Sequence, residues 1–262
     1  MIAPSPQAIR SRDNPLLKEL RKLAREPGAY RKLGRIWLEG EHLFHAARAR
    51  GVPIAIVLCS ESFWSQTPAG WADGARRVIV VPDALMATIG ALESPAPMGC
   101  VIDLPALPSL GHGVSAVVLD RLQDAGNVGS ILRSAAAFGF GQVIALKGTA
   151  ALWSPKVLRA GMGAHFTLRL IEGMEADALD ALGLPLVATS SHRGQWLHEM
   201  QGRRALPYPC AWLFGHEGQG VCPFLEARAD HHVRIAQPGG EESLNVAAAA
   251  AICLYASTPV QS

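Results

Sequence analysis

The spacing of apolar residues predicts a small α/β domain in the first hundred positions. Residues 15–26 place Leu16, Leu17, Leu20 and Leu23 on one helical face and charges on the other, and a second helix is predicted over 41–50. Apolar runs predict strands at 54–58, 78–81 and 99–102. A short helix is predicted over 83–89, capped by Asp83.

From Ser115 onward, short apolar runs alternate with helical segments. Strands are predicted at 116–119, 142–146, 186–189, 211–214 and 233–235, and helices at 128–138, 155–161, 175–182 and about 243–257. This alternation is typical of a mostly parallel sheet covered on both faces by helices. Residues 105–114 are rich in Pro and Gly, so we expect domains at 1–104 and 115–262 joined by this linker.

The distribution of charged residues indicates a candidate surface for phosphate groups, which the hydrophobic pattern does not reveal. The 262 residues carry a net charge of only +2, but residues 10–50 hold eleven Lys or Arg against five Asp or Glu. This stretch, which includes Arg10, Lys18 and Arg35, is either a phosphate-binding face or an ordinary solvated helix face.

Other compositional features exclude several classes. The five cysteines form no CxxC pair and no zinc-ligand spacing with histidine, and Cys210 and Cys253 lie in apolar runs where buried thiols are expected. The start of the chain lacks the pattern of a signal peptide, and the longest apolar run, 246–256, is too short to span a bilayer. We expect a soluble cytoplasmic protein without a metal.

Three polar clusters follow predicted strands, at the edge where open α/β sheets bind ligands. The first contains Asn127 and Arg133, the second is the glycine-rich loop 214–220 with its acidic residue, and the third contains Ser243 and Asn245. Each has a structural alternative. Asn127 and Ser243 are good helix caps, Arg133 is compatible with a surface ion pair, and a glycine-rich loop is compatible with a plain turn.

Two further cations, Lys156 and Arg159, lie about one helical turn apart. They suit either RNA phosphates or a solvated turn. The chain has no P-loop motif, and Gly126-Asn127-Val128-Gly129 is only a fragment of a dinucleotide-binding fingerprint.

The order of the clusters is more specific than any one of them. The series N-x-G-x-x-x-R, W-S-P-K-V-x-R-A-x-M-G-A, F-G-x-E-G-x-G and S-L-N-V-A resembles the SpoU (TrmH-like) branch of the SPOUT RNA ribose methyltransferases over residues 115–257. The segments 9–18 and 39–41 are similar to that family's RNA-binding domain, which resembles a ribosomal protein. Departures include Ala125 where the family commonly has Pro, and His216 where Asn or Ser is usual.

The resemblance implies a homodimer with a C-terminal trefoil knot and an active site completed across the dimer interface. It implies methyl transfer from S-adenosylmethionine to a ribose 2′-hydroxyl of RNA, with ribosomal RNA favoured over transfer RNA. The cofactor is expected against Phe214, Gly215, Gly218, Ile235 and Leu244.

The resemblance also assigns roles to polar residues. Arg133 is expected to act at the hydroxyl, more easily by stabilising the oxyanion than as a base, because an arginine guanidinium does not give up its proton readily. Asn127 is expected to orient Arg133, Glu217 to shape its loop, and Ser243 and Asn245 to hold the cofactor or the ribose. The expected RNA contacts are Arg10, Lys18, Arg35, Lys156 and Arg159.

Three alternatives stay open. The chain could methylate transfer RNA, or it could be a catalytically silent RNA-binding factor in ribosome assembly. A nicotinamide dehydrogenase is the third, although the complete glycine fingerprint is missing. Binding of S-adenosylmethionine with turnover, of RNA alone, or of a nicotinamide distinguishes them.

Overall fold

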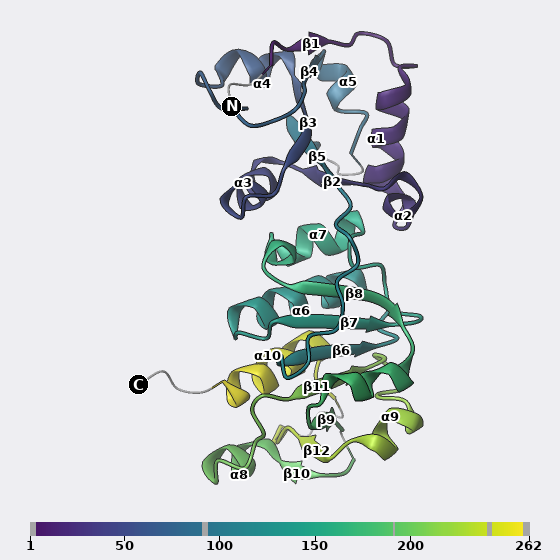
Figure 1. The fold of residues 1–262 in the computed structure, drawn as a ribbon, viewed down its shortest axis with the longest axis vertical. Coiled ribbons are helices and arrows are strands. Elements are labelled where there is room, and N and C mark those ends of the chain that lie inside the picture. Colours follow the sequence, from purple (N-terminus) through teal and green to yellow (C-terminus); the bar gives the residue numbers. More distant parts are fainter. Residues whose placement is uncertain (1–3, 91–93, 191, 240–242, 259–262) are drawn as a thin grey trace. The chain divides into compact units, whose positions relative to one another are not determined.

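A computed structural model describes residues 4–90, 94–190, 192–239 and 243–258. The chain divides into two compact units (Figure 1). The first comprises Met1–Ala106 with Trp153–Phe166, and the second comprises Leu107–Leu152 with Thr167–Ser262. The segment 153–166 therefore groups with the N-terminal residues although it lies between two strands of the second unit in sequence.

The first unit is built on a five-stranded mixed sheet. Its order is β1 (Gln7–Ala8), β4 (Val78–Val81), β3 (Ile54–Ser60), β5 (Met98–Asp103) and β2 (Arg35–Glu39). Strand β5 runs antiparallel to both β3 and β2, whereas β3 and β4 are parallel. The helices are α1 (Pro15–Arg25), α2 (Ala29–Leu33), α3 (Glu41–Ala49), α4 (Glu61–Gln66), α5 (Asp83–Met86) and α7 (Pro155–Gly161), and a 3₁₀ turn, η1, spans Ala164–Phe166.

Helix α1 shows why the predicted leucine pattern folds as a helix. Asn14 precedes it and accepts the Leu16 N–H at 2.9 Å, which satisfies one of the donors left free at a helix start. Pro15 occupies the first turn, where its missing N–H is no loss. Leu17, Leu20 and Leu23 are buried, so the apolar face supplies the packing.

The predicted cap of α5 is wrong. Pro82 occupies the cap position, and Asp83 is the first residue of the helix. The Asp83 carboxylate instead accepts the Ser62 N–H at 3.3 Å and the Ser62 hydroxyl. These contacts lower the pKa of Asp83, the Ser62 side-chain bond having the largest effect.

The second unit is a seven-stranded parallel sheet, which confirms the predicted α/β class. Its order is β10 (Gln195–Trp196), β12 (His231–Arg234), β9 (Leu186–Thr189), β11 (Ala211–Gly215), β6 (Ala116–Asp120), β7 (Gln142–Leu146) and β8 (Arg169–Met174). All described pairings of this sheet are parallel. Its helices are α6 (Ala125–Ala137), α8 (Leu197–Gly202), α9 (Pro223–Arg228) and α10 (Val246–Ser257), with the 3₁₀ helix η2 over Ala176–Leu182.

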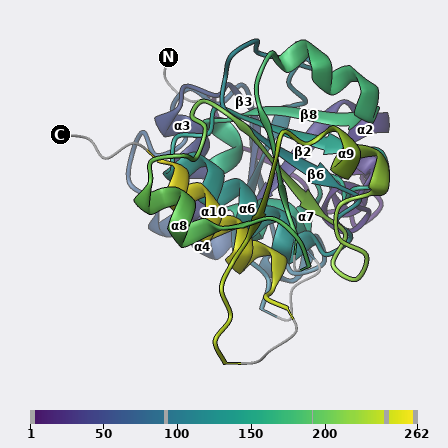
Figure 2. The same ribbon diagram turned by 90° about the horizontal axis from the view of Figure 1, so that it is seen from below.

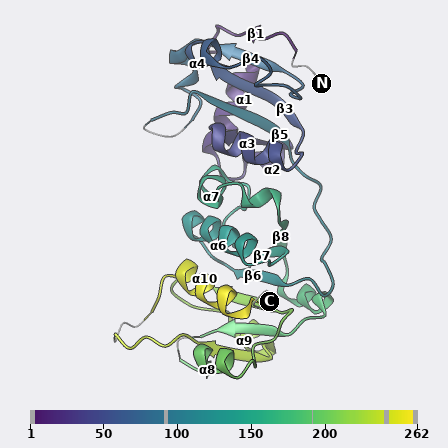
Figure 3. The same cartoon turned by 90° about the vertical axis from the view of Figure 1, so that its left-hand side faces the viewer.

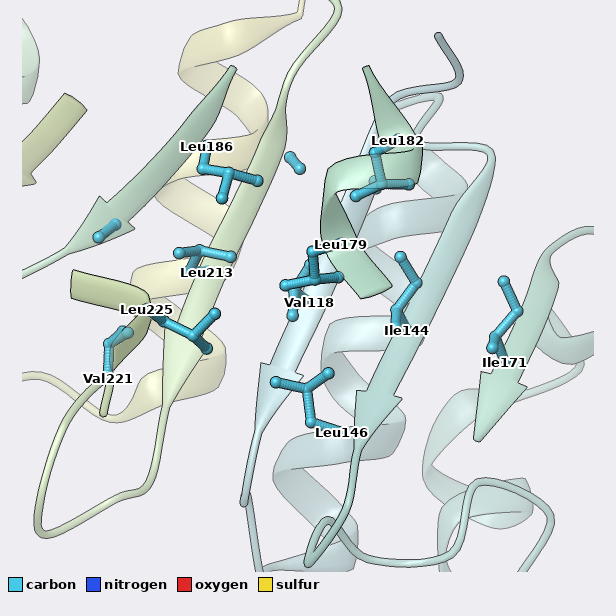
Figure 4. Packing of buried hydrophobic residues seen from close by; sticks show 13 residues of the cluster. Val118, Ile144, Leu146, Ile171, Leu179, Leu182, Leu186, Leu213, Val221 and Leu225 are labelled. Atoms are coloured by element: carbon cyan, nitrogen blue, oxygen red, sulfur yellow. The ribbon is translucent and has the colours of Figure 1, made fainter. Parts of the chain in front are cut away.

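Both faces of this sheet are covered, as its apolar strands require. Val118, Ile144 and Leu213 point to the face covered by η2 and α9, where Leu179 and Leu225 pack against them (Figure 4). Helices α6 and α10 lie side by side on the opposite face (Figure 3). There the buried indole of Trp212 donates to Ser257 of α10 at 2.9 Å. Figure 2 shows α8 beside α10 and α9 on the other side of the sheet.

The expected linker is tied to the second unit over part of its length. The fully buried Gln142 accepts the Gly111 N–H at 3.0 Å and donates to the carbonyls of Gly111 and Val114 at 2.9 and 2.7 Å. Every polar atom of this buried amide therefore has a partner, which fixes the entry of the chain into β6.

The described residues carry neither a membrane-crossing helix nor a metal-binding group. None of their helices is long and apolar enough to cross a bilayer. No group of three or more His, Cys, Asp or Glu among them could hold a metal ion. Cys210 and Cys253 are buried as predicted, and burial raises the pKa of Cys210 to about 12.

Candidate active site at the carboxyl edge of the second sheet

Helix α6 begins three residues earlier than predicted. Asp124 is its cap and accepts the Asn127 N–H at 2.7 Å, so Asn127 lies in the first turn. The structural alternative for Asn127, a helix cap, is therefore wrong. Because Asp124 already satisfies the helix end, the Asn127 amide is available for contacts with other loops.

Helix α10 begins three residues later than predicted, and Asn245 is its cap. The Asn245 Oδ1 accepts the N–H groups of Ala247 and Ala248 at 2.9 and 3.3 Å. Ser243 lies outside the helix and is exposed, so the expectation that Ser243 opens this helix is wrong. Gly240, Glu241 and Glu242, which belong to the predicted third cluster, lie outside the described residues.

The loop after β11 is a tight turn that requires glycine at its base. His216 and Gly220 form an isolated bridge, and the Gly220 N–H donates to the His216 carbonyl at 2.8 Å. A Cβ atom at Gly215 would lie 2.0 Å from the carbonyl carbon of Gly220 and from the Val221 nitrogen. No side chain fits between these backbone segments.

Glu217 at the tip of this loop joins it to the start of α6. Its Oε1 accepts the Asp124 N–H at 3.0 Å and the Asn127 side-chain Nδ2 at 3.3 Å, and its Oε2 accepts the Gln123 N–H at 3.2 Å. Partial burial raises the pKa of Glu217, but the hydrogen bonds from Asp124, Gln123 and Asn127 outweigh it and hold the pKa below its ordinary value. Glu217 is therefore an ionised acceptor at neutral pH.

The side-chain amides of Asn127 and Asn245 form a chain of hydrogen bonds that ends on Glu217, and each amide donates towards Glu217. A carboxylate only accepts, so Asn127 must turn its NH₂ group towards Glu217. The Asn127 Oδ1 then accepts from Asn245 Nδ2 at 2.9 Å, and the Asn245 Oδ1 accepts from the α10 N–H groups. This relay joins the ends of β6 and β11 to the start of α10. It brings together three of the five predicted catalytic residues: Glu217, Asn127 and Asn245.

Arg133 and Ser243 are outside the relay. Arg133 is exposed, and its guanidinium forms no hydrogen bond or ion pair with the part of the chain that the structure describes. It follows Asn127 by six residues, which separates the two side chains by about 120° around the helix axis. The surface ion pair considered as an alternative for Arg133 is absent from the described residues. Ser243 has no hydrogen-bond partner among them either.

The residues expected at the cofactor differ in how they could contact it. The Phe214 ring is fully buried against Trp212, so only the backbone of Phe214 is available to a ligand. Gly218 is exposed, Ile235 is half-buried, and the Leu244 side chain is 40% exposed.

Two unpaired polar atoms flank Ile235. Arg234 Nε and Gln237 Oε1 are buried and have no hydrogen-bond partner among the described residues. A polar ligand in the loops after β11 and β12 would satisfy atoms of this kind, so these residues fit a nucleoside cofactor.

Four of the five cations expected to bind RNA are paired with carboxylates. Arg10 pairs with Glu61 at 3.1 Å and Lys18 with Asp13 at 3.0 Å, and all four side chains are more than 40% exposed. Such pairs are weak, because solvent screens both charges. Arg35 also pairs with a carboxylate, and Lys156 is exposed.

Arg159 differs from the other cations in its surroundings. It lies 3.6 Å from Glu39, whose side chain is only 7% exposed. Burial raises the pKa of Glu39, and the charge of Arg159 opposes that rise. Arg159 therefore balances the charge of the buried Glu39 carboxylate within the first unit, and an RNA phosphate would have to compete with Glu39 for it.

Sequence reasoning missed the residues that hold the loops together. Asp124 was identifiable, because Asp is a favoured helix cap and Asp124 lies between a predicted strand and a predicted helix. Gln123, Asp120 and Arg121 were not, because their contacts depend on loops that are distant in sequence.

A cavity opens at the opposite, amino-terminal edge of the same sheet. Its lining includes Leu179, Leu186, Arg228, Asp180 and Asp230. Arg228 pairs with Asp180, and Asp230 accepts the Leu186 N–H at 2.8 Å. These charged groups are occupied by one another and by the backbone, and the cavity is remote from the relay.

Comparison with known proteins identifies the family. The SpoU rRNA Methylase family model matches residues 115–255. An uncharacterized tRNA/rRNA methyltransferase from Synechocystis is 33% identical, covering 95% of this chain and 92% of that protein. The 23S rRNA (guanosine(2553)-2′-O)-methyltransferase RlmP of Bacillus subtilis is 29% identical, covering 94% and 97%.

A solved structure supports the same assignment over the whole chain. The AdoMet-bound rRNA methyltransferase from Sinorhizobium meliloti is 25% identical, covers 97% of this chain and 98% of that chain, and aligns with a TM-score of 0.81. The resemblance inferred from the motifs is confirmed: the chain belongs to the SpoU rRNA methylase family.

Proposed function

We propose that this protein transfers a methyl group from S-adenosylmethionine to a ribose 2′-hydroxyl of RNA. The observation that carries the proposal is the relay from Glu217 through Asn127 to Asn245, which joins three loops at the carboxyl edge of a parallel sheet. Ligands of open α/β sheets bind at this edge. The family membership and the AdoMet-bound relative from Sinorhizobium meliloti give the reaction and the cofactor.

The cofactor supplies an electrophilic methyl group when it is bound. We assign its binding to the backbone around Gly215 and Gly218 and to the segment containing Ile235 and Leu244. Next to Ile235, Arg234 Nε and Gln237 Oε1 have no partner among the described residues, so they are available to a polar cofactor.

The chain's own contribution to the chemistry is positioning and charge. The relay holds the first turn of α6 and the loop after β11 in one arrangement, and positioning of reacting groups can remove several kcal/mol of barrier. Arg133 stabilises the negative charge that develops on the 2′-oxygen as its proton passes to solvent, because a guanidinium carries a fixed positive charge. Ser243 lies near the start of α10 and is assigned to the cofactor or the ribose.

Arg133 lies about 120° from Asn127 around α6 and does not join the relay, so we infer that one chain does not bring Arg133 to the site formed by the relay. We assign the missing group to a second copy of the chain, which makes the active enzyme a homodimer. A trefoil knot formed by the C-terminal segment and a cytoplasmic location also stay predictions from the sequence.

Ribosomal RNA is the proposed substrate. The relatives from Bacillus subtilis and Sinorhizobium meliloti are named as rRNA methyltransferases, whereas the one from Synechocystis is named for both tRNA and rRNA. We assign RNA binding to the first unit. Arg10 and Lys18 are the best candidates there, because RNA phosphates can displace their weak, exposed carboxylate partners.

The test of the proposal is the variant Arg133→Ala. Its methyl transfer to RNA should fall by at least about 100-fold, because removal of one oxyanion-stabilising group has an effect of this size. Its affinity for S-adenosylmethionine, measured by calorimetry, should stay that of the wild type. If affinity and turnover fall together because the Ala variant is unfolded, that variant does not test the role of Arg133. The conservative variant Arg133→Lys is then assayed for turnover in its place. Wild-type turnover in the folded Lys variant contradicts a role for the guanidinium fork.

A further inference from the structure

Asp120 and Arg121 form a second connection between the loops at this edge, separate from the relay through Asn127. Asp120 ends β6 and is 2% exposed. Its carboxylate accepts the Cys222 N–H at 2.7 Å, which ties it to the residue that follows the loop after β11. It also accepts both Nε and Nη2 of Arg121, at 2.9 and 3.2 Å. A buried carboxylate with three donors is held in one orientation.

The backbone at Arg121 is the feature that makes this pairing possible. Consecutive side chains of a strand point to opposite faces, so neighbours in an extended chain do not form a bidentate pair. Arg121 leaves that alternation because its φ is +61°, in the left-handed region that a non-glycine side chain rarely adopts. The strain is held by surrounding contacts, since the Arg121 N–H donates to Thr149 Oγ1 at 3.0 Å.

The remaining Arg121 amino group reaches the loop that carries Glu217. Its Nη1 donates to the side-chain Oε1 of Gln219 at 3.0 Å. The Arg121 carbonyl accepts from Gln123 Nε2 at 3.1 Å, and Gln123 is the residue whose N–H binds Glu217. The Arg121 side chain thus contacts the loop 216–220 directly through Gln219. The Arg121 carbonyl also holds Gln123, whose N–H donates to Glu217 in the same loop.

We propose that Arg121, held by Asp120, is a positioning residue that keeps the loop 216–220 in the conformation that binds S-adenosylmethionine. The inference rests on the proposed function, because it assigns that loop to the cofactor. A fork-shaped guanidinium suits this task, because it bonds to Asp120 and Gln219 at once with little loss of side-chain freedom. We call the contacts of Arg121 with Asp120 and Gln219 the brace. The brace acts on affinity for the cofactor, whereas Arg133 acts on the chemical step.

The central variant is Arg121→Gly, because glycine accepts the positive φ and relieves the strain while removing the guanidinium. Cofactor affinity, measured by calorimetry with S-adenosylmethionine on the full chain, should weaken by about tenfold or more, the size expected for a lost charge-assisted hydrogen bond. The KM for the cofactor should rise in parallel. The kcat at saturating cofactor should change by less than about threefold, because the chemical groups are untouched.

Two further variants make the test specific. Gln219→Ala removes only the outer contact and should weaken cofactor binding about threefold, and the double variant should be no weaker than Arg121→Gly alone, because both act through one bond. The matched control is Arg228→Ala, an arginine of the same unit paired with Asp180 at the opposite edge of the sheet. It should bind the cofactor as the wild type does.

The outcomes separate the two proposals. Wild-type affinity in folded Arg121→Gly and in Gln219→Ala overturns the brace, and so does a loss confined to kcat. If Arg121→Gly fails to fold, Gln219→Ala alone decides between these outcomes. A wild-type protein that is folded and binds no S-adenosylmethionine overturns the proposed function and the brace with it.

Discussion

At the scale of single residues, the charge of Glu217 holds the loop after β11 in place. Its carboxylate has two backbone donors and one side-chain donor, and together they keep its pKa below the ordinary value. An acid whose pKa is lowered by folding stabilises the fold fully above its unfolded pKa, and this contribution is lost as the pH falls through the folded pKa.

The variant Glu217→Gln tests whether the charge of Glu217 stabilises the fold at neutral pH and stops doing so in acid. At neutral pH the free energy of unfolding should fall by about 1 kcal/mol, a modest value because the carboxylate is exposed and screened. The difference from the wild type should shrink as the pH falls below the ordinary Glu pKa of about 4.3 and through the lower pKa of folded Glu217, because the wild-type carboxyl becomes protonated over that range. Urea unfolding at a series of pH values measures it. A difference that stays constant into the acid range contradicts the assigned charge.

The residue types of the site were predictable, but their partners were not. Asn127, Glu217 and Asn245 follow strands and accompany glycines, and this placement is visible in the sequence. The direction of the relay depends on which atoms meet across more than ninety residues, and no local pattern encodes that. Arg121 could not be predicted either, because its contacts also lie far away in sequence. Its left-handed backbone conformation occurs at an arginine, whereas a glycine or an asparagine would have indicated it.

At the scale of elements, the central strands were predicted well because each is a continuous apolar run. β7 has the predicted bounds, and β6 and β11 extend one residue further. β2 and β8 were missed, because their apolar runs, 36–38 and 170–171, are short and have charged residues on both sides. Helix starts were displaced where several capping residues lie in succession, as at α6 and α10.

The cap of α10 has two separable functions, and two substitutions distinguish them. Asn245→Ala removes both the cap and the donor to Asn127, so the free energy of unfolding should fall by about 1 kcal/mol and turnover should fall too. Asn245→Asp keeps a cap acceptor at a helix start that favours negative charge, so stability should be retained while turnover falls.

Thermal unfolding and methyl-transfer rates of the two variants give both readouts. Wild-type turnover in Asn245→Asp shows that the hydrogen bond from Asn245 to Asn127 is dispensable, which contradicts the relay as part of the site.

At the scale of the whole molecule, we propose that a second chain completes the site, because Asn127 and Arg133 lie on different sides of α6. In the proposed dimer with two-fold symmetry, each site would take Asn127 from one chain and Arg133 from its partner. Coexpressed Asn127→Ala and Arg133→Ala chains should therefore recover activity, up to about a quarter of the wild-type level, since half of randomly mixed dimers contain one intact site.

The two variants assayed separately are the control for this experiment. No recovery in a mixed dimer whose composition is verified by differently tagged chains means that both residues act within one chain. The assignment of Arg133 to the partner's site is then wrong.

Methyl transfer to RNA is the central claim, and one measurement tests it most directly. Purified protein is incubated with labelled S-adenosylmethionine and unmodified total RNA, and ribosomal and transfer fractions are then separated and digested to nucleosides. The account predicts label in a 2′-O-methyl nucleoside of the ribosomal fraction, and none with Arg133→Ala. Label in the transfer fraction alone contradicts the proposed substrate, and no label in either fraction from folded, dimeric protein contradicts the proposed reaction.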